Sequence, residues 1–324
     1  MIPFRTFGIV PYATREGIRY ISSRHSELYP LEKTAGTFRV VTFGGSTTEQ
    51  KVGRVHYPLL LQSALRECLN RDTVEVINVG NAAYATPHSL ILLELDVLSW
   101  DPDLVILTEN TNDRSATYFP NFTFDYSNKY SDPFYLGQNL TSRFSTMNVL
   151  FQHSRVYWVA RDKLATAIEK LNSSDKLTRR RPQGHDPNPE GREVFKRNLR
   201  SFVTLAHSNG IEVILASQPL GPADLVAIPY ERPYNKNIFL PLVEEEISHH
   251  ASYNRALEEV AKETGVWFVD NARVMNGVEE YFIDSVHYKE AGLRKLTQNY
   301  SDFMIGNNLM KCHLPFGRIG HVNA

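Results

Sequence analysis

Phe38-Arg39-Val40-Val41-Thr42-Phe43-Gly44-Gly45-Ser46-Thr47-Thr48 is the stretch that decides the fold. Its first six residues are mostly β-branched or aromatic, which is typical of a buried strand. Two glycines then permit backbone angles that other residues avoid, and Ser46 follows at once. Open α/β sheets bind their ligands at the carboxyl ends of the strands, so the Ser46 hydroxyl is a candidate nucleophile. The alternative is a serine that only caps a helix in a tight turn.

The overall composition is that of a globular protein and not of a nucleic-acid-binding one. The chain has 324 residues, with 35 lysines and arginines against 36 aspartates and glutamates, so its net charge is −1. This balance gives no argument for a nucleic-acid partner and no field to steer a strongly charged substrate. The two cysteines, Cys68 and Cys312, do not make a disulfide framework. Cys68 lies on a helical apolar pattern, and we expect a small core residue there.

The location of the protein stays open in the sequence. No apolar run is long enough to span a bilayer. Residues 1–20 lack a basic region followed by a long apolar one, so they do not predict a signal peptide. An export signal or anchor upstream of residue 1 would not be visible here, which leaves exported, anchored and cytoplasmic locations open. The sequence gives no basis for an oligomeric state.

Apolar runs of strand length alternate with segments of helical periodicity along most of the chain. This alternation predicts one α/β domain over residues 37–305, with about five parallel strands and helices on both faces of the sheet. The expected strands are 38–43, 74–79, 104–107, 212–216 and 266–270. The expected helices are 58–69, 90–100, 190–209, 253–262 and 290–304.

Four segments break this alternation. Residues 1–36 are predicted to form an irregular arm lying on the domain, and residues 306–324 a tail. An aromatic-rich insertion over 114–188, with a helix at about 148–171, and a proline-rich irregular segment over 220–248 leave the sheet at its carboxyl edge. Aromatic side chains suit stacking on sugar rings. Packing of the insertion onto the domain would account for them equally well.

A serine nucleophile needs a base and a carboxylate that orients the base. Asp284 and His287 are three residues apart, on a turn that runs toward a helix, so the carboxylate can reach Nδ1 and leave Nε2 free for Ser46. A helix N-cap and a first-turn surface histidine are the alternatives for these two residues. The pair His249-His250 has no cysteine or carboxylate at ligand spacing, so no metal site is predicted.

Oxyanion donors are expected from the loops after the second and third strands. Asn112 can aim its side-chain amide at the sheet edge, and the backbone around Ala83 can offer an N–H group. The alternative for Asn112-Asp113 is a turn pair that satisfies its own backbone. Three further polar residues at this edge are candidates to line the substrate site: Thr47, Asn110 and Gln218.

In combination and order, four blocks of the sequence resemble the SGNH hydrolases, also called GDSL esterases/lipases. The blocks are Gly44-Gly45-Ser46-Thr47, the loop 78–86, Asn110-Thr111-Asn112-Asp113 and Asp284-Ser285-Val286-His287. The resemblance covers about 37–305 without the insertion. It implies a flavodoxin-like three-layer α/β/α sandwich. Ser46 would then be the nucleophile and an oxyanion donor through its own N–H, Asn112 and Ala83 the other donors, Asp284 the orienting carboxylate and His287 the base.

The sequence departs from the family pattern at three positions. The first block reads Gly-Gly-Ser-Thr in place of Gly-Asp-Ser-Leu, which resembles a bacterial branch that includes exported polysaccharide-modifying members. Ala83 and Asn110 stand where the family has glycines. The Ala83 N–H survives this change unless the turn needs a positive φ, which alanine resists. Asn110 tolerates left-handed angles better.

The sequence therefore predicts a serine esterase that needs no metal or cofactor and acts on small, acetyl-like esters carried by carbohydrate. An O-acyltransferase or a non-hydrolytic carbohydrate-binding module on the same fold is the first alternative, and a lipase or thioesterase the second. A phosphate cradle at Gly44–Thr48 is weaker, because the stretch lacks the Gly-Lys-Ser/Thr ending of a P-loop.

Overall fold

The domain is built on a five-stranded parallel sheet, and the predicted α/β fold is confirmed. The computed structural model describes residues 12–69, 73–119, 121–130, 188–227 and 241–309. The strand order is β5-β4-β6-β7-β8, so the first strand of the sheet lies inside it and the chain reverses direction around it. The strands are β4 (Phe38–Gly44), β5 (Val74–Asn78), β6 (Leu104–Thr108), β7 (Glu212–Ala216) and β8 (Trp267–Val269).

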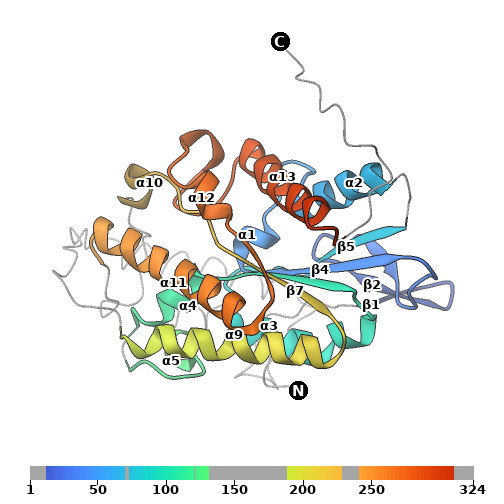
Figure 1. Cartoon of the computed structure of the whole chain (residues 1–324), viewed down its shortest axis with the longest axis horizontal. Helices are drawn as coiled ribbons and strands as arrows, with labels where there is room; N and C mark the ends of the chain where they lie inside the picture. The colour runs from blue at the N-terminus through green and yellow to red at the C-terminus, as the bar shows by residue number, and fades with distance from the viewer. Residues whose placement is uncertain (1–11, 70–72, 120, 131–187, 228–240, 310–324) are drawn as a thin grey trace, which may run out of the picture.

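Helices cover both faces of this sheet (Figure 1). The α2 (Tyr57–Leu69) and α13 (Glu290–Gly306) helices pack together on one face. The opposite face carries α3 (Thr86–Leu95), α9 (Glu190–Ser208) and α11 (Val243–Thr264). Successive strand residues serve opposite layers, since Val40 packs with the α2 layer and Val41 with the α9 layer. The shorter helices are α1 (Ser46–Glu49), η1 (Val97–Trp100), α4 (Thr111–Ala116), α5 (Ser127–Tyr130), α10 (Ala223–Ala227), α12 (Asn271–Met275) and η2 (Glu279–Tyr281).

The N-terminal arm is ordered into a small sheet, so the prediction of an irregular segment is wrong for residues 12–30. Three short strands pair antiparallel: β1 (Tyr12–Arg15), β2 (Ile18–Ser22) and β3 (Leu28–Pro30). Glu16 and Gly17 both have positive φ, as a two-residue hairpin turn requires. Strands of three to five residues are too short for an alternating pattern to stand out in the sequence.

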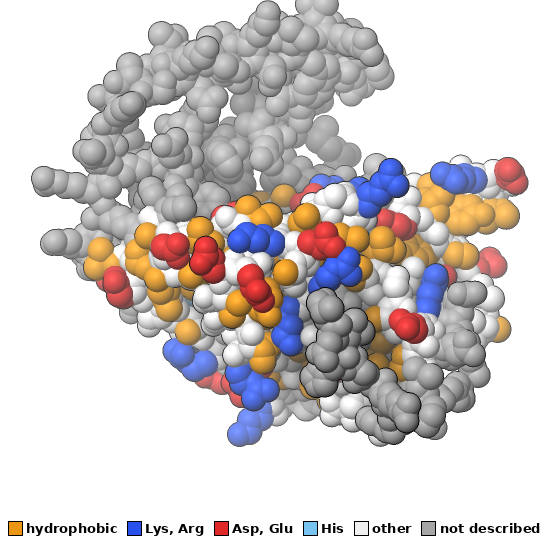
Figure 2. Space-filling view, turned by 90° about the horizontal axis from the view of Figure 1, so that it is seen from above, with side chains coloured by type: hydrophobic (Ala, Val, Ile, Leu, Met, Phe, Trp, Pro, Cys, Tyr) orange, Lys and Arg blue, Asp and Glu red, His pale blue; other side chains and the backbone are white. Residues whose placement is uncertain are grey.

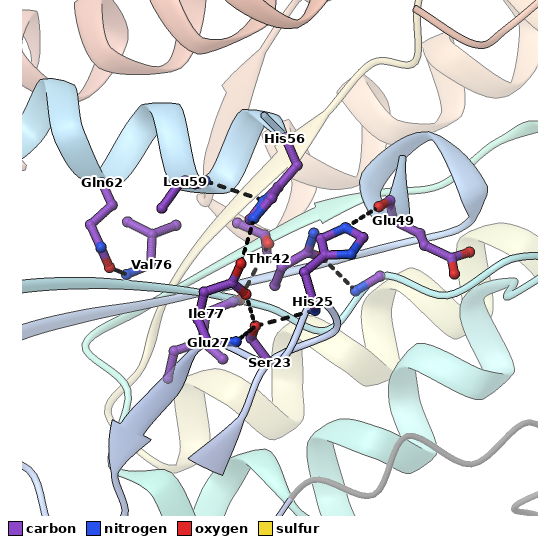
Figure 3. A network of polar contacts seen from close by, with 12 residues as sticks. Ser23, His25, Glu27, Thr42, Glu49, His56, Leu59, Gln62, Val76 and Ile77 are labelled. Atoms are coloured by element: carbon purple, nitrogen blue, oxygen red, sulfur yellow. Dashed lines mark hydrogen bonds and ion pairs between the residues drawn. The ribbon is translucent and has the colours of Figure 1, made fainter. Parts of the chain in front are cut away.

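The small sheet is joined to the main domain by a polar network (Figure 3). Arg24 forms an ion pair with Glu49 at the end of α1, and His25 Nε2 lies 2.6 Å from the Glu49 carbonyl. The Glu27 carboxylate lies 3.1 Å from Nε2 of the buried His56 and accepts a hydrogen bond from Ser23. The Ser23 hydroxyl contacts the Glu27 carboxylate and not an imidazole, so Ser23 is not arranged as a nucleophile.

A buried arginine lies at the amino end of the main sheet. Arg39 is 0% exposed and its Nε donates to Glu75 at 2.7 Å. Its remaining donors reach the carbonyl oxygens of Pro30 at 2.8 Å and Leu31 at 3.3 Å, together with that of Trp100. The segment that follows the small sheet therefore supplies hydrogen bonds to a cation inside the main domain.

Residues 220–248 contain more helix than the sequence predicts. The α10 helix lies within them, and α11 begins at Val243, ten residues before the expected start at Tyr253. The first turn of α11 is Glu244-Glu245-Glu246, and acidic residues stabilise a helix N-terminus without contributing to apolar periodicity. The insertion helix expected at 148–171 lies outside the described residues.

Acidic and basic side chains are interspersed on the face of the molecule seen in Figure 2, in keeping with the net charge of −1. Among the described helices, none is both long enough and apolar enough to cross a bilayer. Cys68 is buried, as expected for a core residue, but it is disulfide-bonded and not a free thiol.

The Glu27 carboxylate should make folding stability depend on pH. Burial alone would raise its pKa, but the hydrogen bonds from His56 and Ser23 prevail and lower the pKa from 4.5 to about 2. The ionised carboxylate therefore stabilises the fold above pH 4.5, and this contribution is lost as the pH falls toward 2. We expect Glu27→Gln to lose less unfolding free energy over this interval than the unsubstituted protein, as measured by urea unfolding at each pH.

The exposed Glu32 provides the control for this experiment. Glu32→Gln should leave the pH profile of the unfolding free energy unchanged. Parallel profiles for Glu27→Gln and the unsubstituted protein would contradict the assignment.

Candidate active site

The turn that carries Ser46 has no room for side chains at the two residues before it. A Cβ on Gly44, whose φ is +157°, would lie 2.2 Å from Thr48 Oγ1 and 2.7 Å from the Thr108 carbonyl. A Cβ on Gly45 would lie 2.4 Å from the Asn112 amide nitrogen. The two glycines therefore allow the loop after β6 to pack directly against the turn.

Ser46, His287 and Asp284 form a continuous hydrogen-bonded chain. The distance from Ser46 Oγ to His287 Nε2 is 2.8 Å, and the distance from His287 Nδ1 to Asp284 Oδ2 is also 2.8 Å. All three residues are half-buried, so the serine is accessible. Asp284 and His287 lie in a loop before α13, closed by a bridge between Phe282 and Tyr288. The predicted residues are thus brought together from opposite ends of the sequence.

The Asp284 carboxylate is held in its ionised form. Burial would raise its pKa, but hydrogen bonds from the His287 ring and from the backbone N–H groups of Val286 and His287 outweigh that effect and lower the pKa to about 2. These N–H groups donate to Oδ1 at 2.9 and 2.8 Å, while Oδ2 faces the imidazole. The carboxylate can therefore orient Nδ1–H over the whole range in which the protein would work.

A two-point clamp joins the serine helix to the histidine loop. The Gln50 side chain donates to the Tyr288 carbonyl at 2.5 Å and accepts from the Tyr288 N–H at 2.7 Å. Gln50 follows α1 and Tyr288 follows His287, so the clamp fixes the position of His287 relative to Ser46. The sequence contains no sign of this contact, because the two residues are 238 positions apart.

The loops that carry two of the predicted oxyanion donors, Asn112 and Ala83, lie against the turn that carries Ser46. The Asn112 amide nitrogen lies beside Gly45 and donates to the Tyr84 carbonyl at 2.7 Å, which leaves its second hydrogen available. Within the described part of the chain, no group accepts a hydrogen bond from the N–H of Ser46 or of Ala83. Ala83 has φ +65°, the left-handed conformation that alanine resists.

The residue after Asn112 has a structural role. The Asp113 carboxylate is buried and accepts hydrogen bonds from the Thr86 N–H at 3.1 Å and the Thr86 hydroxyl at 2.5 Å, at the start of α3. Burial raises the pKa of Asp113, although the hydrogen bonds from Thr86 act in the opposite direction. Asp113 thus satisfies the start of the neighbouring helix and not its own backbone.

The three candidate substrate-lining residues are buried and engaged with protein groups. Asn110, at 0% exposure, donates to the His250 carbonyl and to Asn254, so the prediction of substrate contact is wrong for it. Gln218 donates to Thr47 at 3.2 Å and accepts from the Thr111 N–H at 2.9 Å. Gln218 therefore links Thr47 of α1 to the Thr111 N–H of α4. These buried polar side chains form hydrogen bonds with each other and with the backbone, as buried polar groups usually do.

The aromatic residues expected to form a wall are largely packed in the described part of the insertion. Tyr118, Phe119 and Tyr126 are buried, and the Phe122 ring packs against the rings of Phe124 and Tyr126. Phe124 is 53% exposed. The remaining aromatics of this segment lie outside the described residues. In the part of the chain that is described, no group of three His, Cys, Asp or Glu side chains is placed to hold a metal ion.

Comparisons with known proteins identify the family of the chain. A model of the GDSL-like Lipase/Acylhydrolase family matches residues 42–295, more than half of the chain. No curated protein matches it. The chain is similar to solved structures of an acetylxylan esterase from Geobacillus stearothermophilus, with 14% identity, 83% and 94% of the two chains covered and a TM-score of 0.47. It is also similar to a lipase/acylhydrolase from Enterococcus faecalis, with 18% identity, 84% of this chain and 97% of that chain covered, and a TM-score of 0.47. Similarity at these scores carries no argument about substrate.

The strained backbone of Ala83 leads to a stability prediction. A left-handed conformation costs alanine about 1–2 kcal/mol, and glycine adopts it without strain. Since glycine also loses about 0.5–1 kcal/mol more conformational entropy on folding, we expect Ala83→Gly to raise the unfolding free energy by up to about 1.5 kcal/mol. Denaturant unfolding measures this difference.

The neighbouring Ala82 provides the matched control, because it is exposed and has no positive φ. Ala82→Gly should lower the unfolding free energy by about 0.5–1 kcal/mol. Equal destabilisation by the two substitutions would show that Ala83 is not strained.

Proposed function

Because the chain belongs to the GDSL-like lipase/acylhydrolase family and is an ester-hydrolysing enzyme, we propose that it cleaves esters through an acyl intermediate on Ser46. The observation that carries the proposal is the hydrogen-bonded chain Ser46–His287–Asp284, with both contacts at 2.8 Å. Such a chain is what hydroxyl nucleophiles require, since a serine is a weak nucleophile without an adjacent base.

The proposed reaction has two steps. Ser46 Oγ attacks the ester carbonyl while His287 Nε2 takes its proton, and the resulting oxyanion accepts hydrogen bonds from the Ser46 and Ala83 N–H groups and from the Asn112 amide. Collapse expels the alcohol, which receives the proton from His287 and leaves an acyl ester on Ser46. Water, activated by the same histidine, then attacks this ester and releases the carboxylic acid. Asp284 stays ionised and stabilises the imidazolium in both steps.

For the substrate, we propose small acyl groups such as acetyl, carried by carbohydrate. The support is the composition of the segment 114–188, which is rich in tyrosine, phenylalanine and turn residues. A lid over long acyl chains would be expected to show an amphipathic helix with a broad aliphatic face. The Gly-Gly-Ser-Thr form of the first block, which resembles the polysaccharide-modifying branch of the family, is further support for this proposal.

The nucleophile is tested by substitution and by covalent labelling. Ser46→Ala and His287→Ala should each abolish hydrolysis of p-nitrophenyl acetate to a similar extent, because the two groups act in one step. Asp284→Asn should be milder, since the imidazole can still reach the serine. A fluorophosphonate probe, read by peptide mass spectrometry, should label Ser46.

The exposed Ser127 supplies a control for this test, and Ser127→Ala should leave both hydrolysis and labelling unchanged. Labelling of another serine, or full activity of Ser46→Ala, would refute the proposed nucleophile.

The acyl group is tested with p-nitrophenyl esters of increasing chain length and with acetylated xylose. We expect kcat/KM to fall from acetyl and butyryl to octanoyl esters, because the proposed site has no broad aliphatic face to bury a long alkyl chain. Acetate released from the sugar ester should be measured in the same series. Preference for octanoyl or longer esters would replace the carbohydrate proposal by a lipase or thioesterase.

A further inference from the structure

The short helix α5 lies behind both loops that carry the oxyanion donors. Two adjacent residues of this helix, Lys129 and Tyr130, reach different loops. Lys129 contacts Asn112, which follows β6, and Tyr130 contacts Ala83, which follows β5. The helix comes from the insertion, outside the four blocks that resemble the family. One segment therefore touches the two donors that Ser46 does not itself supply.

Lys129 fixes the orientation of the Asn112 amide. Its side chain is 0% exposed, and Nζ donates to the Asn112 backbone carbonyl at 2.8 Å and to Ser115 Oγ at 2.9 Å. Nζ also lies 3.4 Å from Asn112 Oδ1. An ammonium group donates and never accepts, so the amide oxygen must face Lys129. The amide nitrogen is then directed to the opposite side, toward Tyr84 and Gly45.

The positive charge of Lys129 also strengthens the Asn112 amide as a hydrogen-bond donor. A cation beside the amide oxygen polarises the amide and strengthens its N–H groups as donors. The site is also set among buried side chains, where charges interact more strongly than in water. A positive charge on the far side of the donor therefore favours the transition state, in which the substrate oxygen becomes negative, over the neutral ester.

Tyr130 holds the backbone of Ala83. Its hydroxyl donates to the Ala83 carbonyl at 2.5 Å, and its ring packs edge-on against His88 at 4.6 Å. The His88 ring in turn stacks on Tyr84 at 4.9 Å. This arrangement supports the loop at the residue whose φ is +65°, the conformation that a free alanine would leave.

We propose that Lys129 and Tyr130 are positioning residues of the oxyanion hole: Lys129 orients and polarises the Asn112 amide, and Tyr130 holds the Ala83 peptide. The inference rests on the proposed function, because it assigns these contacts to the transition state of that reaction. It adds two residues that neither the family blocks nor the hydrogen-bonded chain at Ser46 includes.

The experiment measures kcat and KM for p-nitrophenyl acetate in Lys129→Met and Tyr130→Phe. Loss of a whole oxyanion donor costs about 10²–10³ in kcat, which is the loss expected for Asn112→Ala. Misplacing a donor forfeits part of this, so we expect kcat to fall about 10–100-fold in Lys129→Met and about 3–10-fold in Tyr130→Phe. KM should stay within about twofold, since the neutral ester does not need the hole.

Two further measurements separate positioning from a general structural role. The inhibition constant of phenylboronic acid, which forms an anionic tetrahedral adduct with a serine, should weaken in proportion to kcat in both variants. In an Asn112→Ala background, Lys129→Met should change kcat less than about threefold, because its route to the reaction is gone. Ser127→Ala, on the same helix, should leave kcat and inhibition unchanged.

Each outcome decides the proposal. Tyr130→Phe removes one hydroxyl, so it tests the inference even if Lys129→Met fails to fold. An unchanged kcat in both variants, or losses confined to KM, would overturn it. If Lys129→Met lowers kcat by the same factor in the unsubstituted protein and in Asn112→Ala, the role assigned to Lys129 is overturned. An unsubstituted protein that neither hydrolyses esters nor reacts with a fluorophosphonate at Ser46 would instead refute the proposed function, and the inference with it.

Discussion

The missing side chains at Gly44 and Gly45 are the constraint on which the rest of the site depends. Because nothing projects from these residues, the end of β6 and the Asn112 amide can approach the turn that presents Ser46. Gly80, after β5, is under the same restriction, since a Cβ there would lie 2.7 Å from the Glu49 backbone nitrogen. Three strand ends thereby meet at van der Waals distance. This close backbone packing brings the loops that follow β5 and β6 up to the turn that carries Ser46.

A second, polar set of contacts adds the C-terminal loop to this frame. The backbone packing around the glycines does not include His287, which arrives from the far end of the chain. Gln50 supplies the missing link by pairing with both backbone groups of Tyr288. The carboxylate of Asp284 meanwhile organises its own loop through two backbone N–H groups. Ser46 and His287 are thus held together by hydrogen bonds to the main chain, which do not involve the imidazole ring.

Local sequence patterns predict the sheet and most of its helices. They also predict that Ser46 and His287 lie close together. Apolar runs indicate the strands, and parallel strands bring their carboxyl ends to one edge whatever their distance in the chain. Gln50 and Lys129 belong to no such pattern, since their partners are fixed only by tertiary packing. The buried position of Asn110 could not be predicted, because a polar residue at a strand end looks the same in the sequence whether it faces a ligand or a buried carbonyl. The first turns of α11 could not be predicted either, because their residues are acidic and carry no apolar period.

The buried guanidinium of Arg39 bears on where this domain begins. Two of its hydrogen bonds are to the carbonyl oxygens of Pro30 and Leu31, ahead of the first strand of the main sheet. A chain started at residue 37 would keep the ion pair with Glu75 but would leave part of a charged group without acceptors, in a place that water does not reach. Tyr29, also buried, would leave a gap over β5. The family blocks thus delimit the catalytic part, while the smallest unit able to fold by itself should extend upstream to include the antiparallel strands.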